Sequence, residues 1–146
     1  MWEYEHSVEI AAPPDAVWEC WSDIPSWPTW NAGITTVTVD GPLAVGTSFT
    51  MTVPPDDEAI TMRIVDVVPG RMFTDQVDFQ GVVVTTVHRL EPTPRATTVI
   101  TYRTEITGPD ADTVGPAIGP DITADFPDVL AALSALAESR SDPTRR

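Results

Sequence analysis

Residues 17–31 read VWECWSDIPSWPTWN and hold four of the five tryptophans of this 146-residue chain. Trp18 and Trp21 are three residues apart, as on one face of a helix, and a Pro-Pro pair shortly before them fits a first helical turn. Pro25 and Pro28 then interrupt any longer helix. The stretch therefore predicts two short helices with a large apolar surface.

On both sides of this stretch, apolar and polar residues alternate, as they do in antiparallel strands with one buried face. The alternation before it begins with Trp2, and the segments after it end at Gly or Pro turns. The predicted strands are residues 2–10, 34–40, 47–53, 59–68, 72–79, 82–91 and 97–107. Their inward faces are largely apolar, so one face of the sheet needs a cover.

The C-terminal segment is predicted to form a helix that supplies that cover. Pro127 removes one backbone hydrogen bond of this helix, which predicts a kink near Thr123. Residues 140–146 are polar and are expected to fray, which leaves a single domain over residues 1–139. A helix of about 20 residues is predicted because apolar side chains recur every three or four positions: Ile118, Ile122, Phe126, Val129, Leu133 and Leu136.

Composition excludes several classes of function. The chain has 22 Asp and Glu, no Lys and only 8 Arg, for a net charge of −14. It is therefore not expected to bind nucleic acid or an anionic membrane. The lack of lysine excludes Schiff-base chemistry. The two histidines are not spaced as a pair of metal ligands and Cys20 is the only cysteine, so the sequence predicts neither a metal site nor a disulfide. We expect a cytoplasmic protein without a cofactor.

The few polar residues on the inward face are informative, because an unpaired buried polar group costs about 1–3 kcal/mol. If Gln80 and Gly81 form a two-residue turn, Asp75 pairs with Thr86 in the register of the hairpin. His88 then lies diagonal to Asp75 on the same face, within reach of its side chain.

The next connection extends this cluster. A five-residue loop over residues 92–96 would place Ile100 beside His88 and Tyr102 beside Thr86. Tyr102 would then share one patch of the inward face with His88 and the neighbouring carboxyl group.

Asp75, His88 and Tyr102 are candidate catalytic residues. A carboxylate beside an imidazole orients one ring nitrogen and raises the basicity of the other. A phenol can donate a hydrogen bond to a developing enolate oxygen. The trio could remove a proton next to a carbonyl and promote ring closure or loss of water. The alternative is a satisfied hydrogen-bond network in a partly polar core.

Other residues could reach the same space. Tyr4 and His6 face inward from the first strand, and Asp125 lies at the edge of the apolar stripe of the C-terminal helix. Trp27 and Trp30 could anchor the short helices or form an aromatic rim around a flat ligand. Both interpretations can hold together.

The order of elements resembles the helix-grip fold of the START/Bet v 1-like superfamily. Residues 17–31, residues 68–73 (VPGRMF), residues 88–92 (HRLEP) and the closing helix carry the resemblance, which covers residues 5–138 and points to the bacterial polyketide cyclase/dehydrase-like group. It implies an α+β fold in which a seven-stranded antiparallel sheet curves around a long C-terminal helix, with two short helices between the first two strands. A ligand cavity is expected between sheet and helix.

The resemblance also implies a function. We expect a cofactor-free enzyme, monomeric or homodimeric, that binds a hydrophobic carbonyl compound and promotes its cyclisation or dehydration by acid–base catalysis. The alternatives are a non-catalytic carrier or sensor of a hydrophobic small molecule, and a module that docks proteins through its tryptophan region. The cavity wall is expected to include Tyr4, His6, Trp27, Trp30, Phe49, Met51, Met62, Phe73, Thr86, Ile122, Asp125 and Phe126.

Overall fold

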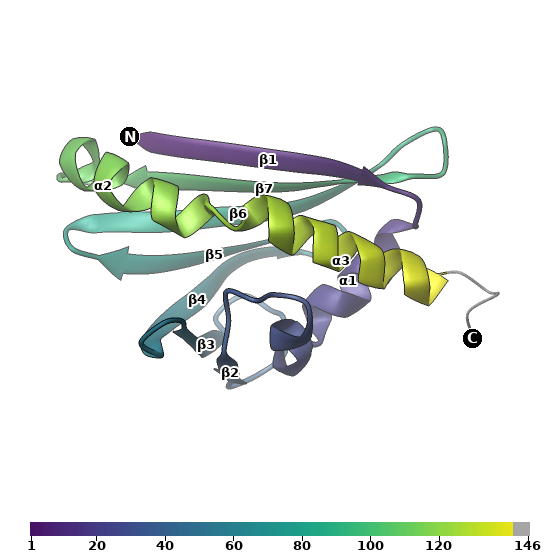
Figure 1. The fold of residues 1–146 in the computed structure, drawn as a ribbon, viewed down its shortest axis with the longest axis horizontal. Coiled ribbons are helices and arrows are strands. Elements are labelled where there is room, and N and C mark those ends of the chain that lie inside the picture. The colour runs from purple at the N-terminus through teal and green to yellow at the C-terminus, as the bar shows by residue number, and fades with distance from the viewer. Residues whose placement is uncertain (142–146) are drawn as a thin grey trace.

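The computed structural model describes residues 1–141 and shows a seven-stranded antiparallel sheet with its helices on one face (Figure 1). The elements, in chain order, are β1 (Trp2–Ile10), α1 (Pro14–Ser22), η1 (Ile24–Thr29, a 3-10 helix), β2 (Thr36–Val39), β3 (Ser48–Val53), β4 (Glu58–Val68), β5 (Met72–Phe79), β6 (Val82–Pro92), β7 (Thr98–Thr107), α2 (Ala111–Thr123) and α3 (Phe126–Ser141). This arrangement confirms the predicted fold class.

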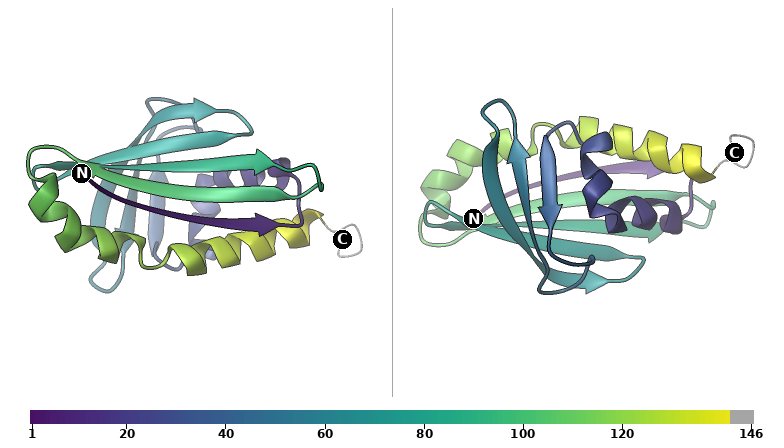
Figure 2. Two further views of the ribbon diagram at one scale, coloured as in Figure 1. Left: turned by 90° about the horizontal axis from the view of Figure 1, so that it is seen from above. Right: turned by 90° about the horizontal axis from the view of Figure 1, so that it is seen from below.

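The sheet has the strand order β1-β7-β6-β5-β4-β3-β2, so the first strand pairs with the last. Figure 2 shows that β2, β3 and β4 run at a steep angle to β1 and β7, because the sheet curls strongly. A register shift between Ile64 and Asp66 lies in β4 where it pairs with β5. Such bulges increase the local twist and bend a sheet, and here the bend forms the concave face that carries the helices.

The C-terminal helix is broken rather than kinked. It forms two helices, α2 and α3, which are separated by Ala124 and Asp125, close to the predicted kink. Pro127 lies in the first turn of α3, where proline costs no hydrogen bond. The helical part begins at Ala111, earlier than predicted, and α3 continues to Ser141, past the predicted domain end at residue 139. The rest of the predicted tail lies outside the described residues.

The strand registers settle which inward residues are neighbours. Asp75 pairs with Thr86 across the β5–β6 hairpin, as predicted from its two-residue turn. The β6–β7 register differs from the prediction by two residues, because β6 continues to Pro92, which pairs with Thr98. His88 therefore lies opposite Tyr102 rather than opposite Ile100.

The apolar residues form two separate cores. The larger one joins α1, η1 and α3 to the sheet and contains fully buried side chains such as Trp21, Phe73 and Leu133. The smaller one joins α2 to β1, β6 and β7. Trp2 packs so closely on α2 that a Cβ at Gly115 or Gly119 would lie 2.6 Å from it. Within residues 1–141, no helix combines the length and apolar character needed to cross a membrane.

Candidate functional site

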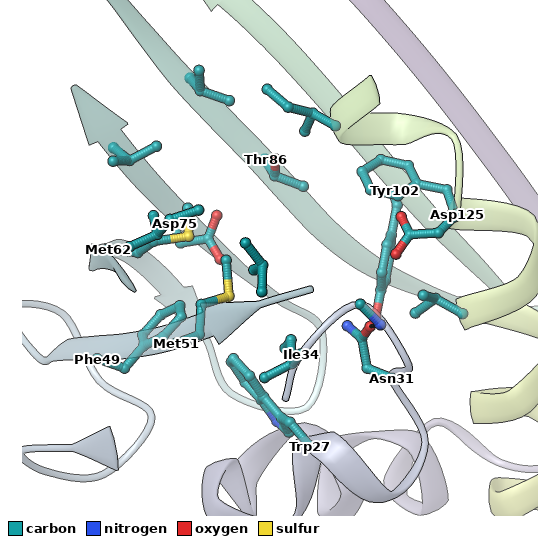
Figure 3. A pocket seen from close by; sticks show the side chains of 18 of the residues that line it. Trp27, Asn31, Ile34, Phe49, Met51, Met62, Asp75, Thr86, Tyr102 and Asp125 are labelled. Atoms are coloured by element: carbon teal, nitrogen blue, oxygen red, sulfur yellow. Dashed lines mark hydrogen bonds between the residues drawn. The ribbon is translucent and has the colours of Figure 1, made fainter. Parts of the chain in front are cut away.

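A cavity of about 1060 Å³ lies between the concave face of the sheet and the helices α2 and α3. Figure 3 shows side chains from β3 to β7, from η1 and from the α2–α3 break converging on it. Most of the residues predicted for a ligand site contribute to its wall: Trp27, Trp30, Phe49, Met51, Met62, Phe73, Asp75, Thr86, His88, Tyr102, Ile122, Asp125 and Phe126.

Two predicted residues, Tyr4 and His6, are not among the residues that line this cavity. They lie on the edge strand β1, which α2 and α3 cover. The Tyr4 ring packs against Phe126, with ring centroids 6.0 Å apart, and His6 pairs with Tyr102 in the β1–β7 register. The helices therefore cover the inward face of β1, where the sequence predicted contacts with a ligand.

Asp75 is the most unusual polar residue of the cavity. It is only 6% exposed, and its Oδ1 atom has no hydrogen-bond partner. Figure 3 shows its carboxyl group pointing into the cavity. Burial raises the pKa of this carboxyl group to about 7, because the charged form loses its hydration. Asp75 can therefore both accept and donate a proton near neutral pH.

His88 is held by its backbone and aromatic neighbours rather than by a carboxylate. Its Nδ1 atom lies 3.1 Å from the carbonyl oxygen of Phe73, which can only accept, so Nδ1 carries the proton. The imidazole stacks on the Phe73 ring with centroids 4.0 Å apart and an interplanar angle of 5°. Burial lowers the pKa of His88 to about 4. The predicted orientation of His88 by Asp75 is therefore wrong, and the ring stays neutral at pH 7.

Tyr102 presents a phenol whose own proton is available. Its hydroxyl oxygen accepts a hydrogen bond of 3.2 Å from Trp21 Nε1, and no described residue accepts the hydroxyl hydrogen. Burial raises the pKa of the phenol, so it stays protonated. The ring is fixed edge-on by His88, at 4.6 Å between centroids, and by Phe126 at 5.6 Å. One cavity is thus lined by two reactive groups. The Tyr102 hydroxyl group can donate a hydrogen bond, and the Asp75 carboxyl group can accept or donate a proton.

The two groups do not touch, because β6 separates their strands. Two strand spacings amount to about 10 Å, and Figure 3 shows Thr86 between Asp75 and Tyr102 on the sheet. The Thr86 hydroxyl bonds to Thr104 at 2.9 Å and is thereby satisfied. A substrate with its reactive carbons between Asp75 and Tyr102 would meet the carboxyl group on one side and the phenol on the other.

The tryptophans form an inner wall and not an exposed rim. Trp27 is 5% exposed and Trp30 is 7% exposed, so neither offers the docking face considered from the sequence. Trp27 Nε1 donates to the backbone oxygen of Trp21 at 3.0 Å. Trp30 Nε1 is buried without a partner, which leaves a second unused polar atom beside the cavity.

Asp125 lies in the break between α2 and α3 and packs against the loop that follows η1. A Cβ at Gly33 would collide with its carboxyl group, so a larger residue there would have to displace that carboxyl group. Asn31 Oδ1 accepts a hydrogen bond of 2.9 Å from the Gly33 amide and fixes the loop. Burial raises the pKa of Asp125, and Asp128 adds to the rise. Neither Asn31 nor Gly33 is among the site residues predicted from the sequence, and the signal for them is an Asn-x-Gly turn.

Among the described residues, no group of three or more His, Cys, Asp or Glu side chains is placed to hold a metal ion. Cys20 is buried, and its thiol donates to the backbone oxygen of Ala16 at 3.4 Å. Burial also raises the pKa of this thiol, which makes it a poor nucleophile.

Comparisons with known proteins support one family. The family described as polyketide cyclase / dehydrase and lipid transport matches residues 1–138. Among curated proteins, none matches the chain. The chain is similar to the solved structure of a norcoclaurine synthase point mutant from Thalictrum flavum, which is 21% identical with a TM-score of 0.77 and with 96% of each chain covered.

It is also similar to two di-domain ARO/CYC proteins. StfQ from the steffimycin biosynthetic pathway is 19% identical with a TM-score of 0.74, over 94% of this chain and 51% of that one. BexL from the BE-7585A biosynthetic pathway is 19% identical with a TM-score of 0.76, over 98% of this chain and 48% of that one. The chain thus spans about half the length of each, and at these identities the similarity shows the fold alone.

Proposed function

Because the chain belongs to the polyketide cyclase/dehydrase and lipid transport family, we propose that it is an enzyme that cyclises or dehydrates a hydrophobic carbonyl compound with its own side chains as acid and base. Asp75 carries this proposal, since it is a buried carboxyl group with an unpartnered oxygen beside the cavity. An unpaired buried polar atom lowers stability, and a ligand that bonds to it offsets that effect.

The roles follow from the protonation states. The Asp75 carboxylate takes a proton from the carbon next to the substrate carbonyl. The Tyr102 hydroxyl donates a hydrogen bond to the enolate oxygen that forms. The enolate carbon then bonds to a second carbonyl carbon of the same molecule, and the new alkoxide takes a proton from the Asp75 carboxyl group. The Asp75 carboxylate then takes a second proton from the carbon next to the first carbonyl, and the resulting carboxyl group gives this proton to the departing hydroxyl group, which leaves as water and gives the dehydrated ring.

His88 has a supporting role in this scheme. Its pKa of about 4 makes it a weak base at pH 7, and its Nδ1 proton is already bonded to the Phe73 carbonyl. The imidazole instead fills the floor between Phe73 and Tyr102 and holds the phenol in place. This assignment moves the base from His88, where the sequence suggested it, to Asp75.

Removing one hydroxyl group tests the assignment. Tyr102→Phe is expected to lower turnover by about 10²–10³-fold, because one donor to the developing oxyanion is lost. The assay follows a panel of aryl-substituted linear diketones by mass spectrometry, in which dehydration appears as loss of one water. Calorimetric affinity for 2-naphthylmethanol, a neutral probe of the cavity, should stay within a factor of about three.

The chain provides a matched control, because Tyr4 is its only other tyrosine. Tyr4→Phe removes a hydroxyl group from a side chain outside the cavity wall and should leave turnover unchanged. Equal turnover in Tyr102→Phe and the natural protein would contradict the role of the phenol. Binding of 2-naphthylmethanol without product from any diketone would instead favour the carrier or sensor.

A further inference from the structure

The charged residues at the mouth of the cavity are all acidic. Asp121, Asp125 and Asp128 line it from the helix side, and Glu58 lines it from the start of β4. Asp78 also borders the cavity, although alternation along β5 places its side chain on the outer face. No arginine is among the residues that line the cavity. Clefts lined by one sign of charge concentrate ligands of the opposite charge.

One of the three aspartates is placed unfavourably for its own helix. Asp121 lies in the last turn of α2, where the helix dipole favours a cation, and that turn has no basic residue. Asp125 precedes α3 and Asp128 lies in its first turn, where the dipole favours an acidic residue. Local helix stability therefore does not account for the carboxylate of Asp121.

The described residues also leave these carboxylates uncompensated. Within residues 1–141, none of the three forms an ion pair with a basic side chain. The arginines bond elsewhere, as the following pairs show: Arg63 with Gln76, Arg71 with the Gly70 carbonyl, Arg89 with Glu91, Arg95 with Glu9, Arg103 with Glu3 and Glu105, and Arg140 with Cys20. The negative charge of these three residues is therefore available to a positively charged ligand.

A second observation points to a ligand in the same cavity. Asp75 lies deeper, is 6% exposed, and leaves Oδ1 without a hydrogen bond while its carboxyl group points into the cavity. The interior thus has an unused carboxyl group surrounded by apolar walls such as Phe49 and Met62. The mouth has three further carboxylates that remain partly hydrated, because Asp121 and Asp128 are exposed and Asp125 is half-buried.

We propose that the cavity selects a hydrophobic carbonyl compound that bears a protonated amine, with the ammonium group held among Asp121, Asp125 and Asp128 and the carbonyl part inside. The ammonium group belongs at the mouth because full burial of a charge is costly even beside a partner. A metal ion is a poorer occupant, because no described group of side chains is placed to coordinate one. This substrate class rests on the proposed function and narrows it.

The test uses three naphthalene probes of similar size and different charge: 2-naphthylmethylammonium, 2-naphthylmethanol and 2-naphthoate. Isothermal titration calorimetry at low salt should show the ammonium probe binding at least about tenfold more tightly than the alcohol, and the carboxylate most weakly. Added salt should reduce the differences. Asp121→Asn/Asp125→Asn/Asp128→Asn should bring the ammonium probe to the affinity of the alcohol.

The control removes the same charge elsewhere. Asp15 and Glu19 on α1 and Asp23 just after it lie outside the cavity wall and are spaced four residues apart. Asp15→Asn/Glu19→Gln/Asp23→Asn should therefore keep the preference for the ammonium probe. Equal loss in both triple variants would overturn the proposal in favour of the general surface charge. Equal affinity of the natural protein for all three probes would overturn it and leave the proposed function standing. Failure of all three probes to bind would overturn both.

Discussion

Asp75→Asn is expected to lower turnover by about 10²–10⁴-fold while making the protein more stable above neutral pH. The loss of turnover follows because an amide cannot accept or donate the proton in the proposed reaction. The gain in stability follows because the natural carboxyl group is buried without a partner for Oδ1. One residue would thus lower stability in order to supply chemistry, as strained or desolvated sites often do.

The pH dependence has a definite sign. Burial raises the pKa of Asp75 from 3.8 to about 7 in the folded protein. The unfolded chain therefore loses this proton first as pH rises, so the folded state loses stability between pH ~4 and pH ~7. This difference in pKa corresponds to a loss of about 4 kcal/mol in the free energy of unfolding. Below pH ~4 both states are protonated, and Asp75→Asn should have little effect.

Urea denaturation of both proteins at pH 4 and pH 8, followed by circular dichroism, measures this difference. Asp78→Asn is the control, because Asp78 lies on the same strand and is exposed, and its effect should stay within about 0.5 kcal/mol at both pH values. If the two proteins differed equally at pH 4 and pH 8, the raised pKa of Asp75 would be wrong. If Asp75→Asn kept full turnover, Asp75 could not be the base.

Trp21→Ala is expected to lower the free energy of unfolding by about 3–5 kcal/mol, because a fully buried indole is replaced by a cavity. Trp21 contacts Phe73 with ring centroids 5.2 Å apart and donates its Nε1 proton to Tyr102. Its backbone oxygen also accepts the Nε1 proton of Trp27. The side chain thus links α1 to the floor of the site, and the backbone oxygen links the same residue to Trp27.

Trp18→Ala is the matched control for Trp21→Ala. Trp18 is its neighbour on α1 but is only half-buried, so the loss in unfolding free energy should be clearly smaller. Trp21→Phe separates packing from hydrogen bonding, because it keeps a large ring and removes the donor to Tyr102. Equal destabilisation by Trp18→Ala and Trp21→Ala in urea denaturation would show that Trp21 is not the link between α1 and the sheet.

The arrangement of elements could be predicted from the sequence because each element has a clear period or a clear stop. Trp2–Ile10 alternates strictly, and it forms β1 with the predicted bounds. The start of α2 was missed because its helical signal is weak. Gly115, Pro116, Gly119 and Pro120 all disfavour a helix interior, and tertiary contacts with Trp2 offset this in the folded protein.

The site could be predicted only where backbone register determines it. The pairing of Asp75 with Thr86 follows from a two-residue turn, whereas the position of Tyr102 depended on where β6 ends. Sequence spacing could not show that His88 bonds to a backbone carbonyl. It could not show either that Trp21 reaches Tyr102, since that contact depends on how α1 packs across the sheet.

The break at Ala124 and Asp125 divides the helical cover between two cores, with α3 in the larger one and α2 in the smaller one. Cooperative unfolding follows such units, and a unit with few buried contacts opens at a lower free energy than the whole domain. Ile118 and Ile122 line the cavity from α2, whereas Leu133 of α3 belongs to the larger core. We therefore expect local opening of α2 to widen the cavity while Phe73 and Tyr102 stay packed in the larger core.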